Sequence, residues 1–102
     1  MNDAEIGTQL SKHRRTIDNL DAALVRILAE RFRATTQVGI LKATHDLPAK
    51  DAGREALQVE RLRRHAEEAE MDPDFAERLL NFIIEEVVQR HKKIALDSKI
   101  AV

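Results

Sequence analysis

The fold of this chain is decided by residues 17–42, which read IDNLDAALVRILAERFRATTQVGILK. Apolar residues recur in this stretch in alternating steps of three and four, which places their side chains on one face of an α-helix. The stripe consists of Ile17, Leu20, Leu24, Ile27, Arg31, Ala34, Val38 and Leu41. Arg31 stands where the pattern expects an apolar residue. The stretch therefore predicts a long helix whose apolar face carries a guanidinium.

A second cation belongs to the same face. Lys42 follows Arg31 by eleven residues, and eleven steps of about 100° return to within roughly 20° of the starting direction. A buried cation is costly unless it is paired. Two explanations remain open: each cation pairs with a carboxylate of its own protein or extends to the surface, or both bind an anion that enters from outside.

The length of this helix predicts how the chain assembles. No proline interrupts residues 8–44, and a helix of that length reaches roughly 54 Å. A compact domain of this size has a diameter of only about 35 Å. The overhanging part of the apolar stripe needs a partner, and the simplest partner is a second copy of the chain. We therefore expect an intertwined homodimer.

The rest of the chain predicts two shorter helices, at about residues 51–70 and 73–96. Pro48 disfavours helix in the linker at residues 45–50, while Asp72 and Pro73 suit an N-cap and a first helical position. The inward stripes are expected at Val59, Leu62, Ala66 and Ala69 in the second helix, and at Leu80, Ile84, Val87 and His91 in the third. Residues 97–102 are expected to fray. The prediction is a single all-α domain over residues 1–102.

Composition narrows the possible functions. The 102 residues include 43% hydrophobic residues, three aromatics and no cysteine, and Lys and Arg (17) nearly balance Asp and Glu (18). This balance gives no indication of nucleic-acid binding, and no apolar run is long enough to span a membrane. The acidic start, Met-Asn-Asp-Ala-Glu, lacks the hydrophobic core of a signal peptide. We expect a cytoplasmic protein.

The candidate site combines charged residues from all three predicted helices: Arg31, Lys42, Asp51, Arg54, Glu55 and His91. Asp51 and Glu55 extend the inward stripe of the second helix backwards, although Asp51 also suits an N-cap. His91 continues an apolar face, where a satisfied core histidine is the common explanation. The sequence has no metal-ligand spacing such as HExxH and no glycine-rich phosphate loop. The set suits binding of a small polyanion without a cofactor or metal.

Taken together, these segments resemble the all-helical chorismate mutases. The resemblance rests on the pattern Arg14-x-x-Ile17-Asp18-x-x-Asp21-x-x-Leu24, Ala29-Glu30-Arg31, Val38-Gly39-x-x-Lys42, Asp51-x-x-Arg54-Glu55 and Ile83-Ile84-Glu85-Glu86. It covers roughly residues 10–94. The resemblance implies an isomerase that converts chorismate to prephenate in phenylalanine and tyrosine biosynthesis. It also implies an intertwined dimer with two active sites and no cofactor.

The resemblance further implies a role for each site residue. Arg31, Arg54 and the partner subunit's Arg14 would bind the two substrate carboxylates, and Lys42 would donate to the ether oxygen of the breaking bond. Asp51 and Glu55 would hold the substrate hydroxyl. Helical spacing agrees with a partner role for Arg14, because it lies about 100° away from the face of Arg31. Without the resemblance, Arg14 would be taken as a solvated arginine.

Two positions depart from the family pattern. The family often has a serine where this chain has Val87, and a glutamine or glutamate as second donor to the ether oxygen where this chain has His91. Three alternatives stay open: an isochorismate-pyruvate lyase or a mutase of amino-substituted chorismate on the same architecture, and a weakly active helical subunit that another enzyme of the pathway activates, which these two departures favour.

Overall fold

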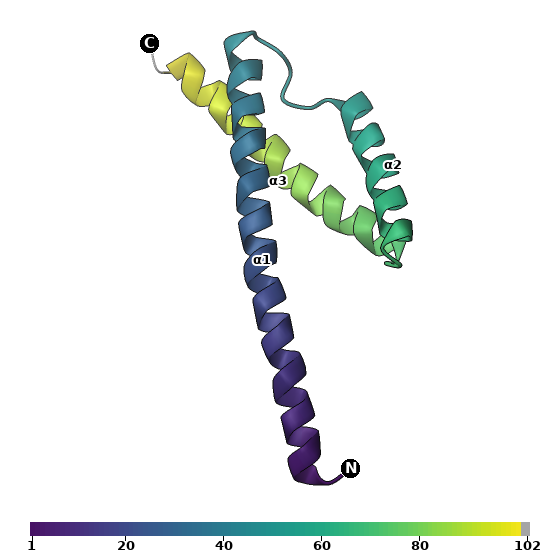
Figure 1. The fold of residues 1–102 in the computed structure, drawn as a ribbon. Helices are drawn as coiled ribbons and strands as arrows, with labels where there is room; N and C mark the ends of the chain where they lie inside the picture. The colour runs from purple at the N-terminus through teal and green to yellow at the C-terminus, as the bar shows by residue number, and fades with distance from the viewer. Residues whose placement is uncertain (101–102) are drawn as a thin grey trace. The chain divides into compact units, whose positions relative to one another are not determined.

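The computed structural model describes residues 1–100, apart from the side chain of Ile100. This part of the chain forms three helices and no strand: α1 (Asp3–Thr44), α2 (Ala52–Glu68) and α3 (Pro73–Ile100), as Figure 1 shows. The predicted all-α class is confirmed. Fraying was expected from residue 97, and this prediction is wrong as far as residue 100, because no proline or glycine ends α3 there. Residues 101 and 102 lie outside the described part.

The start of α1 was predicted about five residues too late. Asn2 caps the helix, because its Oδ1 accepts the backbone N–H of Glu5 at 2.8 Å while its Nδ2 donates to Oε1 of Glu5 at 3.2 Å. Reciprocal bonds between an N-cap residue and a glutamate three residues on are a variant of the capping box. The polar first turn thus starts the helix although it contributes little to the apolar stripe.

Residues Met1–Arg33 form one of two compact units. Taken by itself, this unit is a single helical stretch with an uncovered apolar face. Ile17, Leu20 and Leu24 are each at least half exposed, at 53%, 62% and 50%. Exposed apolar stripes of this length on a helix are typical of an interaction surface.

The second unit begins at Ala34 and contains the end of α1 together with α2 and α3. The chain reverses direction at residues 69–72, so helices α2 and α3 run antiparallel to each other (Figure 1). Its most buried apolar residues are two alanines and a leucine: Ala66, Ala76 and Leu80. The stripes predicted for α2 and α3 are confirmed as buried or half-buried, except at Ala69, which is exposed because it is the C-cap of α2.

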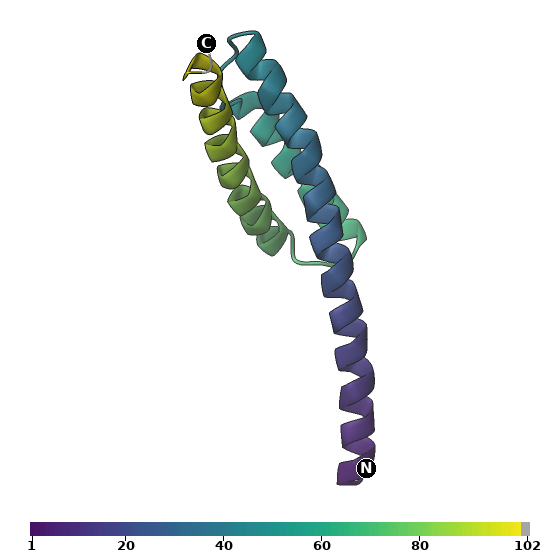
Figure 2. The same ribbon diagram turned by 90° about the vertical axis from the view of Figure 1, so that its left-hand side faces the viewer.

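At the end of α1, the prediction that the apolar stripe packs inside this unit is wrong. Ala34, Val38 and Leu41 are exposed. The neighbouring face, with Thr35 and Gly39, lies against α3, beside which the last turns of α1 run (Figure 2). The absence of a side chain at Gly39 allows the helices to approach closely, so this more polar face packs and the apolar one stays uncovered.

Neither α1 nor α2 has a glycine at the left-handed position that follows its C-terminus. Asp46 and Glu70 each have φ of 57°, in the left-handed region. After α1, the N–H of Leu47 donates to the carbonyl of Lys42 at 2.8 Å, and after α2 the N–H of Met71 donates to that of Ala66 at 2.8 Å. These six-to-one bonds identify Schellman motifs, in which the left-handed residue is usually glycine.

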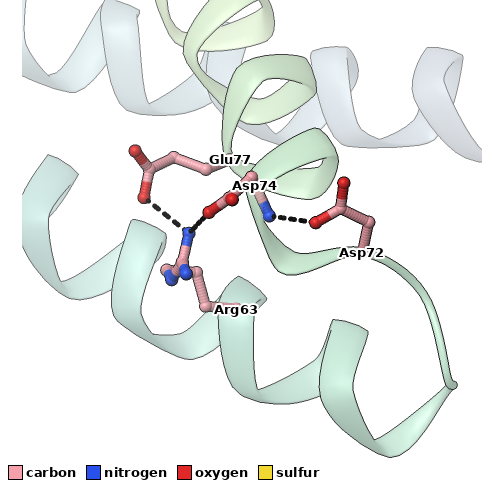
Figure 3. Close-up of polar contacts among 4 residues, drawn as sticks. All are labelled: Arg63, Asp72, Asp74 and Glu77. Atoms are coloured by element: carbon pink, nitrogen blue, oxygen red, sulfur yellow. Dashed lines mark hydrogen bonds and ion pairs between the residues drawn. The ribbon is translucent and has the colours of Figure 1, made fainter.

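Arg63 fastens the start of α3 to α2 (Figure 3). Its Nη1 donates to Asp74 at 2.9 Å and to Glu77 at 3.3 Å. The hydrogen bond with Asp74 is the largest influence and raises the pKa of Arg63; desolvation opposes it, and the charges of both carboxylates add to it. Asp72 caps the same helix by accepting the N–H of Asp74 at 3.0 Å. The predicted N-cap and the helix start at Pro73 are thus confirmed.

Candidate functional site

Lys42 is the candidate cation in the last turn of α1. Its side chain is half-buried, and its Nζ donates to the backbone carbonyl of Ala49 at 3.2 Å. The linker turns back over the helix end because Pro48 and the Schellman motif stop α1 at Thr44. An ammonium has three N–H donors. With one of them given to Ala49, Lys42 is held in place and two donors remain for a ligand.

Asp51, Arg54 and Glu55 occupy the start of α2. Asp51 has an extended backbone, and its Oδ1 accepts the N–H of Arg54 at 3.0 Å. It is therefore the N-cap, as one of the two readings of its position predicted. The side chains of Asp51 and Arg54 are exposed, whereas Glu55 is half-buried, and its Oε2 lies 4.0 Å from Nζ of Lys50. The inward position expected for Glu55 is confirmed, whereas the one expected for Asp51 is wrong, because its side chain caps the helix from an exposed position.

His91 is buried where α3 meets α1, at 4% exposure. Its Nε2 lies 2.7 Å from the backbone carbonyl of Thr35. A carbonyl only accepts hydrogen bonds, so Nε2 carries the hydrogen. The other ring nitrogen, Nδ1, is also buried and has no hydrogen-bond partner among the described residues. The ring is therefore satisfied on one side only. Val87, one turn earlier on α3, is half-buried.

Gly39 makes the position of His91 possible. A Cβ built on Gly39 would lie 2.6 Å from Cδ2 of His91, closer than real Cβ contacts allow, and 3.0 Å from Cδ1 of Ile94, which is tighter than most. Sequence reasoning assigned no function to Thr35, Gly39 or Ala49. A lone glycine within a long helical pattern was the one available signal, because the two backbone carbonyls leave no trace in the sequence.

The two remaining predicted residues, Arg14 and Arg31, lie in the first unit, on α1. Arg14 is exposed, and Arg31 is half-buried. The desolvation expected for Arg31 is thus partial. The other six predicted residues all belong to the second unit: Lys42, Asp51, Arg54, Glu55, Val87 and His91.

The second unit supplies two groups that a polar ligand could use. The ammonium of Lys42 is held by the linker with donors to spare, and the imidazole of His91 keeps one nitrogen unsatisfied. Within residues 1–100, no three His, Asp or Glu side chains are grouped as metal ligands, and no helix is both long and apolar enough to cross a membrane. A fixed donor such as the Lys42 ammonium stabilises negative charge that develops on a bound molecule.

The comparisons with known proteins agree on one family. Residues 13–92 match the model of chorismate mutase type II. The chain is 33% identical over 78 residues to a T-protein of Enterobacter agglomerans, covering 76% of this chain and 21% of that protein. It is 34% identical over 73 residues to a T-protein of Haemophilus influenzae, covering 72% and 19%.

A third relative is the bifunctional chorismate mutase/prephenate dehydratase of Buchnera aphidicola, which is 29% identical over 85 residues, covering 83% of this chain and 22% of that protein. The chain therefore spans about a fifth of the length of each of these three relatives.

Proposed function

Because this chain belongs to the chorismate mutase type II family, we propose that it converts chorismate to prephenate. The observation that carries the proposal, beside the family match, is the placement of Lys42. A half-buried ammonium with one donor fixed by the Ala49 carbonyl is a preorganised cation. Preorganised donors stabilise a transition state because they need no rearrangement when charge develops.

The reaction suits a site without a base or a nucleophile. Chorismate rearranges in one pericyclic step, so the protein has two tasks. It holds the compact conformer in which the reacting carbons meet, and it places positive charge where the ether oxygen gains electron density. In our proposal, Lys42 performs the second task, and Arg31 and Arg54 help the first by binding substrate carboxylates.

The carboxylates at the start of α2 receive the substrate hydroxyl in this proposal. Glu55 is half-buried and Asp51 is exposed. Asp51 uses Oδ1 to cap α2, so its other oxygen is the one offered to the hydroxyl. Val87 contributes an apolar contact, since it has no group that could form a hydrogen bond.

We also propose that the working form is a homodimer in which the partner subunit's Arg14 completes each site. The supporting observation is the apolar face of residues 1–33, on which Ile17, Leu20 and Leu24 are at least half exposed. A second copy of the same helix offers a matching apolar surface. Arg14 is exposed on the same stretch of α1, which leaves its side chain available to another chain.

The direct test adds chorismate to the purified protein and measures prephenate. Parallel reactions with isochorismate and with amino-substituted chorismate identify the other chemistries considered for this architecture. Prephenate as the main product supports the proposal. Release of pyruvate from isochorismate without prephenate formation contradicts it, and so does the absence of turnover on all three substrates.

The dimer is tested by mixing two inactive variants, Arg14→Ala and Lys42→Met. In a mixed dimer of the proposed kind, one site carries both changes and the other carries neither. Random exchange of subunits then restores about a quarter of the wild-type activity, since half of the dimers are mixed and each has one intact site. A mixture that stays inactive after the subunits exchange, as followed by mass spectrometry, contradicts a site shared between chains.

A further inference from the structure

Helix α2 carries a polar residue on its inner face, where an apolar one is expected. Gln58 is half-buried, whereas its neighbour Leu57 is 55% exposed. The two side chains thus reverse the usual pattern, in which apolar residues lie inside and polar residues outside. Within residues 1–100, no residue forms a hydrogen bond with the amide of Gln58. Proteins tend to break the pattern at functional sites, which makes Gln58 a candidate for contact with a ligand.

Gln58 lies on the same face of α2 as the inward carboxylate of the candidate site. Glu55, Gln58 and Leu62 follow one another in steps of three and four, and all three are half-buried. Residues 56, 57, 60 and 61, on the other side of the helix, are exposed. Gln58 lies about 4.5 Å beyond Glu55 along the helix axis, since each residue adds about 1.5 Å. The two side chains can therefore reach one small group together.

The two side chains are complementary towards a hydroxyl group. A carboxylate only accepts hydrogen bonds, whereas an amide also donates through its NH2 group. A hydroxyl has one hydrogen to donate and two lone pairs that accept. A substrate hydroxyl that donates to Glu55 still has an oxygen open to a donor. The NH2 group of Gln58 is a neutral donor in the next turn of the same face.

Resting on the proposed function, we propose that Gln58 is a specificity-determining residue: its amide donates a hydrogen bond to the substrate hydroxyl while Glu55 accepts one from it. A hydroxyl needs both a donor and an acceptor, and this pair supplies one of each. An ammonium in the same place has three hydrogens and no lone pair, so it is bound better by two carboxylates. The pair therefore favours chorismate over an analogue that carries an ammonium instead of the hydroxyl.

The first experiment uses Gln58→Leu, which removes the amide and keeps a side chain of similar size. We expect a higher melting temperature, because a half-buried polar group without a partner is unfavourable. We also expect kcat/KM for chorismate to fall about tenfold, the effect of losing one hydrogen bond to the substrate. Gln89→Leu is the matched control, since Gln89 is exposed on α3 and should keep the wild-type kcat/KM.

Two outcomes of this experiment overturn the inference and leave the mutase assignment intact. If Gln58→Leu keeps the wild-type kcat/KM, the amide does not contact the substrate. If the melting temperature and kcat/KM fall together, the amide serves the fold, and the loss of activity follows from the loss of stability.

The second experiment uses Gln58→Glu, which keeps the shape of the side chain and replaces the donor by a second carboxylate. The amino-substituted chorismate is added as a competitor of chorismate. We expect its inhibition constant, relative to KM for chorismate, to decrease about tenfold in the variant, because the ammonium then meets two acceptors. An unchanged ratio overturns the specificity role of Gln58.

The third experiment does not depend on turnover. Titration with prephenate, which keeps the hydroxyl, should shift the 1H–15N NMR signals of the Gln58 side-chain NH2 group and leave those of Gln89 in place. An unshifted Gln58 signal overturns the inference. An absence of turnover on chorismate contradicts the proposed function, and the response of the Gln58 signal to prephenate then decides the inference alone.

Discussion

The imidazole of His91 fills the space that any side chain at Gly39 would need. A Cβ on Gly39 would approach Cδ2 of His91 to 2.6 Å and Nε2 to 3.0 Å. The ring cannot retreat easily, because it is buried and bonded to the Thr35 carbonyl. These two positions are therefore coupled: the glycine lets the ring lie on α1, and the ring fixes the distance between α1 and α3.

The first prediction is that Gly39→Ala destabilises the protein although alanine favours helix. Overpacking of this kind costs about 1–3 kcal/mol, more than the roughly 1 kcal/mol of helix propensity that alanine contributes. Thermal unfolding followed by circular dichroism measures the difference. Gly7→Ala is the control, since nothing lies within 4 Å of its Cβ position. A melting temperature of Gly39→Ala equal to or above that of the wild type would contradict the coupling.

The second prediction concerns Lys42→Met, which removes the charge but keeps a long apolar side chain. We expect unchanged helix content and a loss of turnover of about a hundredfold or more, the effect of deleting one preorganised donor. Lys93→Met changes an exposed lysine of α3 and should retain full activity. Near-normal turnover of Lys42→Met would refute the assignment of Lys42 to the ether oxygen.

The third prediction separates the two roles of Asp51. Serine caps helices about as well as aspartate, whereas alanine loses about 1 kcal/mol of capping energy. Asp51→Ser should therefore keep the wild-type melting temperature while kcat/KM for chorismate falls, because the shorter hydroxyl lacks the second oxygen. Asp51→Ala should lower both quantities. If Asp51→Ser also keeps the wild-type kcat/KM, the residue is a cap alone.

The fourth prediction addresses the left-handed residues that end α1 and α2. Glycine adopts φ of 57° without the steric cost that a Cβ imposes there. Glu70→Gly should stabilise the protein by about 0.5–1 kcal/mol in denaturant unfolding, the left-handed cost less the entropy of glycine, and Asp46→Gly by less, since aspartate tolerates this region better than glutamate.

Glu68→Gly provides the matched control for this pair, because residue 68 lies within the last turn of α2. There glycine should cost up to about 1 kcal/mol. Opposite signs at positions 68 and 70 support the backbone argument, and a loss of stability at both positions would show that the charge of Glu70 matters more than its conformation.

The number and class of the helices and the turns between them follow from the amino-acid sequence, which also proposes most of the residues of the candidate site. Local physics suffices for these features: Pro48 and Pro73 mark boundaries through their fixed backbone angle, and the stripes of α2 and α3 follow from helical periodicity. The same spacing identified Glu55 as an inward carboxylate and His91 as part of an apolar face.

The face of α1 that packs against α3, and the partners of the polar groups, became known from the folded structure alone. The apolar face at Val38 and Leu41 is uncovered and the face at Gly39 is not, because close approach of two helices depends on the space that both leave at one point. The Thr35 and Ala49 carbonyls hold His91 and Lys42. Every residue has such a carbonyl, so its partner depends on the fold and not on the residue type.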